Sequence, residues 1–577
     1  VRGQQFDDDK RVTMESPRGL LLERDSRAPW HLAAEQGEYY MNRERLSLST
    51  NVRIRHETRE RGEALLKTEH LVVDNRKRIV HTDAPVTIIN RSSLTRATGM
   101  KGWIDDRVLE LENQVERVAA WLAERGIGEG DHVAIYMPNC PAYLPLVLGV
   151  WHVGAVASPL NTRFGVDDLA FVLNDIRPTT LFTSSVFADE TGELKSRVES
   201  LEHLVEVDHD GEFTGFPSAE DAPSRVKRLD EDTAIIMHTS GTTGDPKGVV
   251  QTHRNIGSQV DSGISIFELD ADDTALCSMP LFHVGGLHGA ALMTLFSGGS
   301  LAILPQWDAE QFMGTIENVS ATYSGLVPTM MVDALETAKE GSYDTSSLRF
   351  TFFGGAPAPE PLLEDFRDEF EVDLSNYYGQ TENAGVSITL DPKAELPTGS
   401  LGKLTPAVRG KVVDIDTGEK AQPGEQGELM LRGDIITPGY WERPERNEAL
   451  FTDGWLHTED IVRQDEDGFM YYIDRKDDII HSGGEKVPPS KVENVLQDLP
   501  DVKAVAVFGT DHERWGQAVT AAVVGDDLTE EDIETFCESR EDLPGYMKPR
   551  RVMFVEEFPR TGSQKIDKVA LSEQFEA

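Results

Sequence analysis

Long apolar runs are absent from this sequence of 577 residues, and cysteine is rare. No stretch of about 18 apolar residues occurs, so we expect no membrane span, and the first residues lack the charged start and apolar stretch of a signal peptide. The three cysteines, Cys140, Cys277 and Cys537, define neither a disulfide framework nor a metal cluster, and they suit a reducing cytoplasm. Because the sequence does not begin with Met, we expect that something upstream is missing or was removed.

Positive charge is scarce, but only in one part of the chain. Lysine and arginine total 56 against 101 aspartates and glutamates, a net charge of −45. Residues 1–115 hold 20 basic and 19 acidic residues, so residues 116–577 hold 36 and 82. A strongly acidic surface stays soluble when salt screens its repulsion, and we expect no nucleic-acid partner for it. The acidic part is typical of a high-salt, halophile-type cytoplasm and the neutral part is not, which indicates that two different proteins are joined.

Short alternating runs indicate β-strands in residues 1–109. Polar and apolar residues alternate at 45–49 and 52–55, and further apolar runs occupy 71–73, 79–80, 86–89 and 107–109. Glycine, aspartate and asparagine separate the runs. This even spacing predicts an all-β sheet, barrel or jelly roll.

The pattern changes at about Glu110. Apolar residues from Leu111 to Ala123 recur with a helical period, and Gly126 ends this helix. Strands at 132–136, 155–157 and 180–182 then alternate with a helix at 142–153, which predicts a mostly parallel sheet with covering helices. The end of the chain repeats this pattern on a smaller scale, with strands at 502–507 and 518–524 and a helix at 530–540. We expect this last segment to be a separate α+β lid.

One loop has the composition of a phosphate cradle. It follows a buried strand at 234–237 and consists of Thr239, Ser240, Gly241, Thr242, Thr243, Gly244, Asp245, Pro246, Lys247 and Gly248. Its glycines let backbone N–H groups turn inward, its hydroxyls add donors and its lysine adds positive charge. The spacing is not that of a Walker A loop. A short Gly/Ser/Thr loop alone is more often a polar surface turn, but the full string is more specific.

Further motifs follow this loop in order, at residues 354–357, 378–382, 454–460, 474–477 and 559–566. Together with the loop they resemble the adenylate-forming superfamily of acyl- and aryl-CoA synthetases, nonribosomal adenylation domains and firefly luciferase. The resemblance covers about residues 110–577. It implies a large α/β domain followed by a small α+β lid, and ATP, Mg²⁺ and CoA as ligands.

The resemblance also implies a role for each motif residue. Tyr378 packs on adenine, Thr381 contacts the α-phosphate and Glu382 holds Mg²⁺. Asp460 and Arg475 contact the ribose. The residues expected to bind ATP are Thr239, Ser240, Gly241, Thr242, Thr243, Gly244, Lys247, Gly354, Gly355, Ala356, Pro357, Tyr378, Gly379, Gln380, Asp460 and Arg475.

The implied reaction begins when a substrate carboxylate attacks the α-phosphorus of ATP and expels pyrophosphate. Negative charge builds up on the phosphate oxygens, so Lys247 and Lys565, the mobile lysine of the lid, are expected to supply positive charge. The lid then turns about Asp477, which withdraws Lys565 and brings up its CoA side, so that one site serves two reactions. That side consists of Gly483, Gly484 and Glu485.

His283 distinguishes two branches of the superfamily. Nonribosomal adenylation domains place an aspartate here to bind the α-amine of their substrate, whereas this histidine matches the fatty-acyl and aryl-CoA branch. A lone histidine is more often structural, but in this motif we expect it to act with Thr381, Glu382 and Lys565 in catalysis. The expected acyl pocket suits a fatty or aromatic acid and is lined by His283, Gly286, Leu326, Val327, Met330 and Met331.

Three residues depart from the usual pattern of this superfamily. Glu459 replaces a glycine before the ribose-binding acid, Lys486 replaces an asparagine after the CoA-side turn, and Gln564 replaces a glycine before the mobile lysine. Members of the superfamily have a few dozen residues before the helix that matches 110–125, and we find no counterpart of them in this sequence. We expect these departures to alter loop geometry rather than chemistry.

A second set of motifs occupies residues 33–40, 66–74, 82–88 and 97–103. They resemble the LptC family of periplasmic lipopolysaccharide-export proteins. The resemblance implies a β jelly roll whose groove carries lipid acyl chains and whose open edges pair with neighbours, hence a lipid or β-edge partner for residues 1–109. Residues 110–115 fit the end of one family and the first helix of the other. We therefore expect an artificial or misassembled junction, which makes the chain a chimera.

These patterns predict a multidomain chain with a β jelly roll at 1–109, an adenylate-forming domain at 110–476 and a lid at 477–577. The predicted function is activation of a fatty or aryl acid through acyl-AMP, followed by thioester formation with CoA. Two alternatives stay open: a lipid-binding or lipopolysaccharide-transport protein with an inactive ligase part, and an adenylating enzyme that loads a carrier protein. We expect residues 110–577 in the cytoplasm, whereas the resemblance of residues 1–109 implies the periplasm.

The step in charge leads to a prediction about salt. Molar KCl shortens the Debye length to about 3 Å and should stabilise the acidic part, because its self-repulsion is then screened. The nearly neutral residues 1–115 should be indifferent. Thermal unfolding should show two transitions, only one of which rises with salt, and limited proteolysis should cut near residues 100–116. A single transition that shifts as one unit, without such cleavage, would contradict the division.

Overall fold

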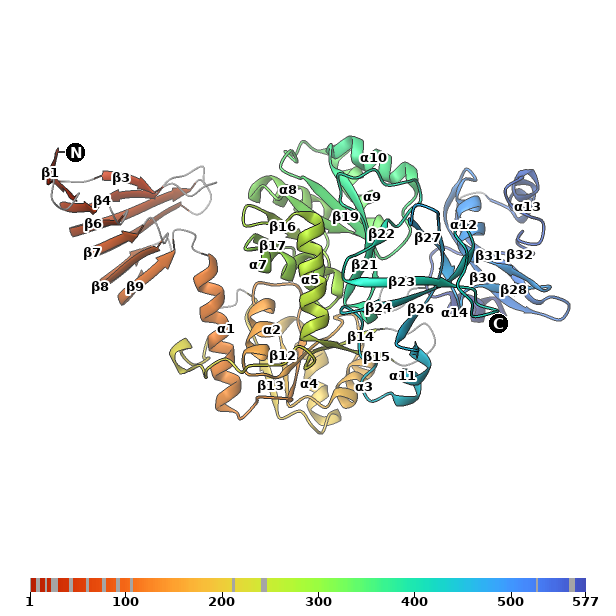
Figure 1. Cartoon of the computed structure of the whole chain (residues 1–577), viewed down its shortest axis with the longest axis horizontal. Helices are drawn as coiled ribbons and strands as arrows, with labels where there is room; N and C mark the ends of the chain where they lie inside the picture. Colours follow the sequence, from red (N-terminus) through yellow and green to blue (C-terminus); the bar gives the residue numbers. More distant parts are fainter. Residues whose placement is uncertain are drawn as a thin grey trace. The chain divides into compact units, whose positions relative to one another are not determined.

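The computed structural model describes residues 2–6, 11–15, 18–21, 30–40, 45–58, 62–74, 79–89, 94–103, 107–209, 213–239, 246–525, 528–559 and 566–576. The chain divides into two compact units, Val1–Glu116 and Arg117–Ala577. Figure 1 colours the elements along the sequence, from the red strands of the first unit to the blue C-terminal elements. Within the described residues, no helix is both long and apolar enough to cross a membrane.

The described part of the first unit forms one antiparallel sheet of nine strands. Its main order is β1-β2-β5-β6-β7-β8-β9, and β3 pairs with β4, which pairs with β6. Leu48 on β6 lies opposite Leu71 on β7, and both are buried, as are Val52 and Ile54 further along β6. The alternation at 45–55 therefore predicted this strand correctly. The strands are β1 (Arg2–Phe6), β2 (Arg11–Glu15), β3 (Arg18–Leu21), β4 (Trp30–Ala33), β5 (Gln36–Tyr40), β6 (Arg45–Thr58), β7 (Gly62–Asp74), β8 (Ile79–Ile89) and β9 (Leu94–Trp103).

Helix α1 (Arg107–Glu124) contains the boundary between the two units. It confirms the helical stripe predicted from Leu111 onward, and its Val118 and Leu122 are fully buried in the core of the second unit. The strand predicted at 107–109 is wrong, because these residues form the first turn of this helix. Three residues are too few to show a period of their own, and the helical stripe that follows them decides their structure.

Two α/β sheets make up most of the second unit. Their orders are β13-β12-β10-β11-β14-β15 and β17-β16-β18-β19-β20-β21-β22. All neighbours in the first sheet are parallel up to β14, and all in the second up to β20, which confirms the predicted mostly parallel sheet. The strands are β10 (His132–Tyr136), β11 (Val156–Pro159), β12 (Thr180–Thr183), β13 (His203–Glu206), β14 (Thr233–Thr239), β15 (Lys247–Thr252), β16 (Thr274–Cys277), β17 (Ser300–Ile303), β18 (Tyr323–Leu326), β19 (Phe350–Gly354), β20 (Asp373–Gln380), β21 (Gly385–Thr389) and β22 (Lys403–Leu404).

The helices that cover these two sheets alternate with their strands. They are α2 (Tyr143–His152), α3 (Val166–Ile176), α4 (Ala188–Arg197), α5 (His253–Phe267), α6 (Val284–Gly286), α7 (Met293–Ser297), α8 (Ala309–Val319), α9 (Pro328–Glu340) and α10 (Glu360–Phe370). Shorter turns are η2 (Ser185–Phe187), η3 (Ala219–Asp221), the π-helical η4 (Leu287–Leu292) and η5 (Thr381–Asn383).

Two smaller sheets complete the second unit. The third sheet contains β23-β24-β26-β25, with β27 on β26, and the fourth contains β29-β28-β31-β30, with β32 on β31. Strands β30 and β31 and helix α13 confirm the elements predicted for the small C-terminal segment. The elements are β23 (Val408–Val413), β24 (Gln426–Gly433), α11 (Pro444–Leu450), β25 (Phe451–Thr452), β26 (Trp455–Gln464), β27 (Met470–Arg475), β28 (Ile480–Ser482), β29 (Glu485–Val487), α12 (Pro489–Gln497), β30 (Val502–His512), β31 (Gly516–Gly525), α13 (Glu530–Ser539), β32 (Arg551–Phe554) and α14 (Lys568–Glu576).

Helix α5, the long green helix at the centre of Figure 1, ties three sheets together. It follows β15 directly and begins with a capping box formed by Thr252 and Asn255. Its last residue, Phe267, stacks on Phe350 of β19 with ring centroids 5.1 Å apart. The amide of Asn255 also donates to the carbonyl oxygen of Ile436 (2.9 Å), in the segment after β24. Strands β15 and β19 are therefore held in a defined relation to the segment after β24.

Candidate active site

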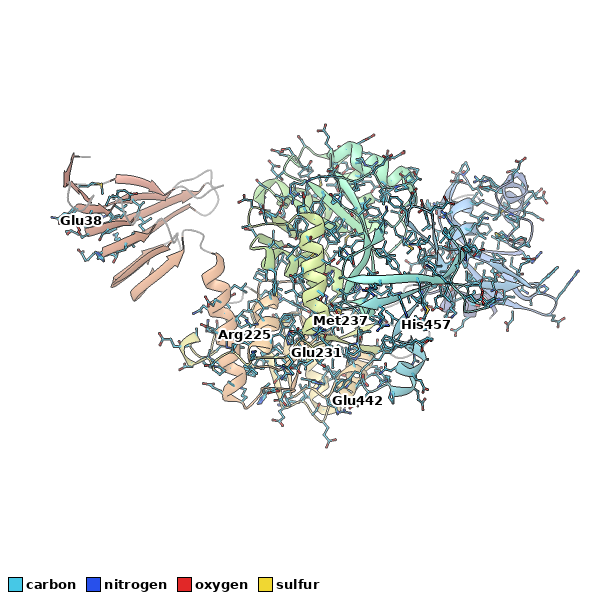
Figure 2. The ribbon with its side chains drawn as sticks, viewed as in Figure 1. Glu38, Arg225, Glu231, Met237, Glu442 and His457 are labelled. Atoms are coloured by element: carbon cyan, nitrogen blue, oxygen red, sulfur yellow. The ribbon has the colours of Figure 1, made fainter. Side chains whose placement is uncertain are left out.

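The phosphate loop connects the two strands of a hairpin. Met237 (Figure 2) is buried in β14, Thr239 ends this strand and Lys247 begins β15 as the cross-strand partner of Thr239. A Cβ atom on Gly248 would lie 3.1 Å from the ring of His238, so the strands approach closely here. The predicted ATP contacts that lie outside the described residues are Ser240, Gly241, Thr242, Thr243 and Gly244.

Lys247 lies in a half-buried environment of mixed charge. Its ammonium lies over the ring of Tyr440, 5.5 Å from the ring centroid. Burial and the nearby Arg446 lower the pKa of Lys247, while Glu459 and Glu382 oppose this shift. A partly desolvated cation interacts more strongly with an approaching phosphate than a hydrated one does.

Glu382 lies on the short turn η5, directly after β20. Thr381 before it is buried, and its carbonyl oxygen accepts a hydrogen bond from Nε2 of Gln251 (2.9 Å). One carboxylate oxygen of Glu382 accepts a hydrogen bond from the hydroxyl of Tyr440 (2.9 Å). Burial and this carboxylate raise the pKa of Tyr440 well above its usual range, so the phenol stays a donor.

Asp460 is the centre of a buried polar network and is only 3% exposed. Its Oδ2 accepts hydrogen bonds from the hydroxyl of Tyr378 and from Nε2 of Gln380 (2.7 Å). Its Oδ1 accepts from Nη1 of Arg475 (3.1 Å). Burial and the neighbouring Asp460 raise the pKa of Tyr378. Burial alone would lower the pKa of Arg475, but Asp460 and Glu459 outweigh this effect and raise it. The phenol therefore stays protonated and the guanidinium stays charged.

Strand register brings this network together. Asp460 on β26 and Arg475 on β27 are directly opposite each other, and Tyr378 and Gln380 both lie on β20. Gly379, which lies between Tyr378 and Gln380, has no room for a side chain, because a Cβ there would lie 1.4 Å from the carbonyl oxygen of Gly385. The network thus joins the second sheet to the third.

The motif at residues 354–357, which the resemblance places beside adenine (the adenine-side loop), begins at the end of β19. Gly354 ends this strand, and a Cβ there would lie 2.2 Å from the carbonyl oxygen of Tyr377. Gly355 has φ +79, in the left-handed region that favours glycine. Ala356 and Pro357 are exposed. These positions leave the loop accessible at the end of the parallel sheet.

Some predicted acyl-pocket residues lie in the core. Leu326 and Met331 are fully buried and belong to a hydrophobic cluster that includes Phe353. Gly286 is also buried, and a Cβ there would lie 2.2 Å from the carbonyl oxygen of Pro280. The structure places these three residues behind the surface.

The remaining predicted acyl-pocket residues are more accessible. His283 is exposed and caps helix α6, where its Nδ1 accepts a hydrogen bond from the backbone N–H of Gly285 (3.2 Å). Val327 and Met330 are half-buried. Val327 lies beside the adenine-side loop, since a Cβ on Gly355 would lie 3.6 Å from its Cγ1. The structure thus brings Val327, but not Leu326 or Met331, next to a predicted nucleotide contact.

Glu459, one of the three departures, has a left-handed backbone with φ 59. Glycine adopts this conformation without steric cost, whereas other residues do not, which explains the glycine that the superfamily usually has here. The carboxylate of Glu459 pairs with Nη2 of Arg475 (2.9 Å). This position therefore combines backbone strain with an additional acidic group at the site.

The predicted hinge residue, Asp477, is exposed between two anchored neighbours. Lys476 before it pairs with the buried Glu428 of β24 (3.0 Å). Asp478 after it lies near Lys568 of α14; burial raises the pKa of this carboxyl, and Lys568 opposes the shift. A rotation at Asp477 would leave Lys476 with the third sheet and carry Asp478 with the C-terminal segment.

The predicted CoA-side glycines form a tight turn between β28 and β29. Gly483 and Gly484 have φ 65 and 90, and a Cβ on Gly483 would lie 2.7 Å from the indole of Trp515. The guanidinium groups of Arg514 and Arg550 lie over this indole, 4.6 and 4.4 Å from its centroid. The turn is therefore flanked by an aromatic surface with two cations, which suits an anionic, aromatic ligand.

Glu485 and Lys486 follow this turn in β29. Glu485 is exposed, and Lys486, the second departure, pairs with both carboxylate oxygens of Asp416 (2.7 and 2.6 Å). Asp416 lies between β23 and β24, so this ion pair connects the fourth sheet to the third. Lys565, the predicted catalytic lysine, and Gln564, the third departure, lie outside the described residues.

The donor set fits Mg²⁺ only together with a nucleotide. Within the described ranges, no group of three or more His, Cys, Asp or Glu side chains could hold a metal ion. Glu382 offers a single carboxylate next to the phosphate loop. Mg²⁺ commonly takes one or two protein carboxylates and completes its shell with phosphate oxygens and water. This arrangement therefore fits the predicted role of Glu382.

Comparison with known families defines the class of the chain. The family model of AMP-binding enzymes matches residues 109–441, and that of their C-terminal domain matches residues 491–565. The chain therefore belongs to the AMP-binding enzyme family. A further model, described as lipopolysaccharide-assembly, LptC-related, matches residues 1–119. The two unrelated models overlap within α1.

Similar proteins cover most of the chain. A long-chain-fatty-acid–CoA ligase of Mycobacterium tuberculosis is 33% identical over 469 residues, which is 80% of this chain and 91% of the relative. A feruloyl-CoA synthase of Amycolatopsis is 35% identical over 473 residues, 81% of this chain and 93% of the relative. Among solved structures, ATP-bound MatB from Rhodopseudomonas palustris is 27% identical with a TM-score of 0.75, covering 83% of this chain and 94% of its own. The o-succinylbenzoate CoA synthetase of Bacillus subtilis, in complex with its acyl-adenylate, is 29% identical with a TM-score of 0.73, covering 82% and 93%.

Sequence reasoning missed several residues of this site. Tyr440 contacts both Lys247 and Glu382, and Trp515 packs on the CoA-side turn. Pro438 and Gly439 before Tyr440 mark a turn in the sequence, but this signal is common to many surface loops. An isolated aromatic residue has no spacing that reveals a contact with a distant motif.

Glu459 provides a test of backbone strain at the site. The variants Glu459→Gly and Glu459→Val both remove the carboxylate, but only valine must hold a branched side chain at φ 59. We expect the valine variant to be less stable than the glycine variant by about 1–2 kcal/mol in denaturant unfolding. Both should change the KM for ATP to the same extent, because both lose the ion pair with Arg475. Equal stability of the two variants would show that the position carries no strain.

Proposed function

We propose that the chain ligates a fatty or aryl acid to CoA in an ATP-dependent reaction that passes through an acyl-AMP. The observation that carries this proposal is the network around Asp460, together with Lys247 and Glu382 on the hairpins after β14 and β20. These elements offer a buried ribose acceptor, a desolvated cation and a metal-binding carboxylate. Four-fifths of the chain is similar to CoA ligases, which supports the same reaction.

The nucleotide would be held at both ends before reaction. Asp460, whose orientation is held by Arg475, would accept hydrogen bonds from the ribose hydroxyls, and Tyr378 would pack on adenine. Backbone N–H groups of the phosphate loop and the ammonium of Lys247 would contact the phosphate oxygens. Fixed donors at these oxygens lower the barrier because they need no reorganisation when charge develops.

The attack of the substrate carboxylate places further charge on the phosphates. Lys247 and Lys565 would stabilise this charge, and Thr381 would donate to the α-phosphate. Glu382 would hold Mg²⁺, which when bound supplies additional positive charge to the phosphate oxygens. Apolar residues at the acyl side exclude water, which protects the acyl-AMP from hydrolysis.

The second half-reaction requires a different face of the C-terminal segment. A rotation at Asp477 would remove Lys565 and present the turn of Gly483 and Gly484 to the acyl-AMP. The adjacent Trp515, with its two arginines, would then bind the nucleotide end of CoA, whose adenine stacks and whose phosphates carry negative charge. A carrier-bound pantetheine lacks this nucleotide end, so the surface favours free CoA over a carrier protein as the acceptor.

A fatty or aryl acid is the substrate class that the site supports best. His283 stands where an amine-binding aspartate would stand in an amino-acid-activating enzyme. The wall beside the nucleotide includes the apolar Val327 and Met330. The names of the relatives specify a long-chain fatty acid and ferulate, one aliphatic and one aromatic acid.

The two parts of the chain have separate origins in this proposal. We propose domains at 1–109, 110–476 and 477–577, with the junction inside α1, where the two family models overlap. The ligase part would work in the cytoplasm, where ATP and CoA are found. The first part keeps the strand pattern of an LptC-related sheet, whose open edges offer a pairing surface for another chain.

A panel of carboxylic acids with ATP, Mg²⁺ and CoA tests the function directly. We expect thioester formation with medium- or long-chain fatty acids or with aryl acids, and much less with acetate or amino acids, because the acyl side offers apolar contacts and no amine acceptor. ATP–pyrophosphate exchange reports the first step alone. Faster exchange with any amino acid than with octanoate or benzoate would contradict the substrate class. No exchange with any acid would favour an inactive ligase part.

Lys565→Ala should separate the two half-reactions. We expect adenylation to fall by about 10²–10³-fold, since the lysine is needed only while charge develops at the α-phosphate. Thioester formation from preformed acyl-AMP should stay near the rate of the unmodified chain. Lys491→Ala, which removes an exposed lysine from α12, is the matched control and should leave both steps unchanged. Equal losses in both half-reactions would exclude a lid that alternates between them.

A further inference from the structure

The segment from Thr437 to Trp441 crosses the site but belongs to none of the motifs predicted from the sequence. Its backbone lies along β15: the N–H of Val250 donates to Gly439 (3.0 Å) and the N–H of Trp441 donates to Gly248 (2.7 Å). At its other end the N–H of Thr437 donates to the carbonyl oxygen of Glu382 (2.8 Å). The segment therefore bridges the strand after the phosphate loop and the turn that carries the metal-binding carboxylate.

Tyr440 is fixed within this segment by its backbone. Its N–H donates to Oδ1 of Asn447 (2.6 Å), and its carbonyl oxygen accepts from Nδ2 of the same residue (2.9 Å). Gly439 before it has φ +141, and a Cβ there would lie 2.7 Å from the Asn447 side chain. These contacts hold the position of the Tyr440 backbone without any help from its hydroxyl.

The side chain of Tyr440 contacts two groups of opposite charge. Its hydroxyl donates to Glu382 (2.9 Å), and its ring faces the ammonium of Lys247 (5.5 Å to the centroid). Among the residues that the structure describes, no ion pair joins Lys247 to Glu382. The two charges interact electrostatically, and without a neutral partner for each they would be drawn into an ion pair that makes both less available to a ligand.

We propose that Tyr440 is a positioning residue that keeps Lys247 and Glu382 apart, so that the lysine faces phosphate while the carboxylate faces the metal ion. The phenol gives the carboxylate a strong neutral donor, and the ring gives the ammonium a weak neutral partner. Neither contact cancels a charge. This inference rests on the proposed function, since it assumes that the site binds ATP together with Mg²⁺.

Tyr440→Phe isolates the hydroxyl, because it keeps the ring and the backbone contacts. Glu382 then loses its neutral donor and pairs with Lys247. We expect the affinity for ATP in the presence of Mg²⁺, measured calorimetrically without an acid substrate, to fall about tenfold. The affinity for ATP in EDTA should change less than about twofold, and the thermal unfolding temperature should not change. The Mg²⁺ concentration for half-maximal pyrophosphate exchange should rise by the same factor, with an unchanged KM for the acid.

One further variant separates the role of the ring from that of the hydroxyl, and a second serves as a control. Tyr440→Leu also removes the ring under Lys247, so it should weaken ATP binding in EDTA as well. Tyr471→Phe is the matched control: this tyrosine of β27 donates to the half-buried Asp465 (3.0 Å), and the loss of its hydroxyl should affect neither measurement.

The outcomes are distinguishable. Unchanged Mg²⁺-dependent affinity in Tyr440→Phe, or an equal loss with and without Mg²⁺, would show that the hydroxyl has only a structural role and would overturn the inference. Failure of the unmodified chain to bind ATP with Mg²⁺ would overturn the proposed function, and the inference with it. A loss confined to the Mg²⁺-containing measurement supports both.

Discussion

The carboxylate of Asp460 is almost completely removed from water, and the nucleotide site is built from the hydrogen-bond donors that replace this water. A buried carboxylate without partners costs several kcal/mol, so it requires donors with good geometry. Tyr378 and Gln380 from β20 and Arg475 from β27 provide them. The second and third sheets must therefore meet in one register for the carboxylate to be satisfied. The same residues are those expected to contact adenine and ribose, so the contacts that stabilise the fold also preorganise the site for its ligand.

This constraint also determines where the chain can bend. Arg475 is held by Asp460, and Lys476 is held by the buried Glu428, so motion before residue 477 would expose paired charges. Asp477 is exposed, and the carboxylate of the next residue, Asp478, interacts with Lys568 of the C-terminal segment. A rotation at Asp477 leaves the Asp460 network intact. It must break the Lys486–Asp416 ion pair and the two hydrogen bonds that Ser490 of α12 donates to β27, one from its N–H to Asp474 (2.8 Å) and one from its hydroxyl to the carbonyl oxygen of Ile473. A surface ion pair contributes about 0–1 kcal/mol and each hydrogen bond about 0.5–1.5 kcal/mol, so these contacts together oppose the rotation by only a few kcal/mol.

Periodicity and motif strings predicted the parts of the structure that are local in sequence. The strand at 132–136, the helix at 530–540 and the mostly parallel sheet follow from patterns longer than one period, whereas the three residues at 107–109 were too few and were assigned wrongly. Motif strings singled out Lys247 and Glu382 as candidate site residues, because each lies in a short segment whose residue order matches the family motif. Tyr440 could not be found this way, since it is 58 residues from Glu382 and its role arises from tertiary contact alone. The positive φ of Glu459 likewise becomes visible only in the backbone.

The acidic surface repels the anionic ligands that the cationic site must bind. ATP and CoA are polyanions, and residues 116–577 carry 82 acidic against 36 basic residues, so at low salt their approach is opposed over a Debye length of about 30 Å. At molar salt this length falls to about 3 Å, and only groups in contact with the ligand still matter. Lys247 and Arg475, which pairs with Asp460, are partly buried, and screening weakens their contacts less than it weakens surface repulsion. High salt therefore removes the repulsion while it leaves the cations of the nucleotide site effective, which is how so acidic an enzyme can bind the polyanion ATP.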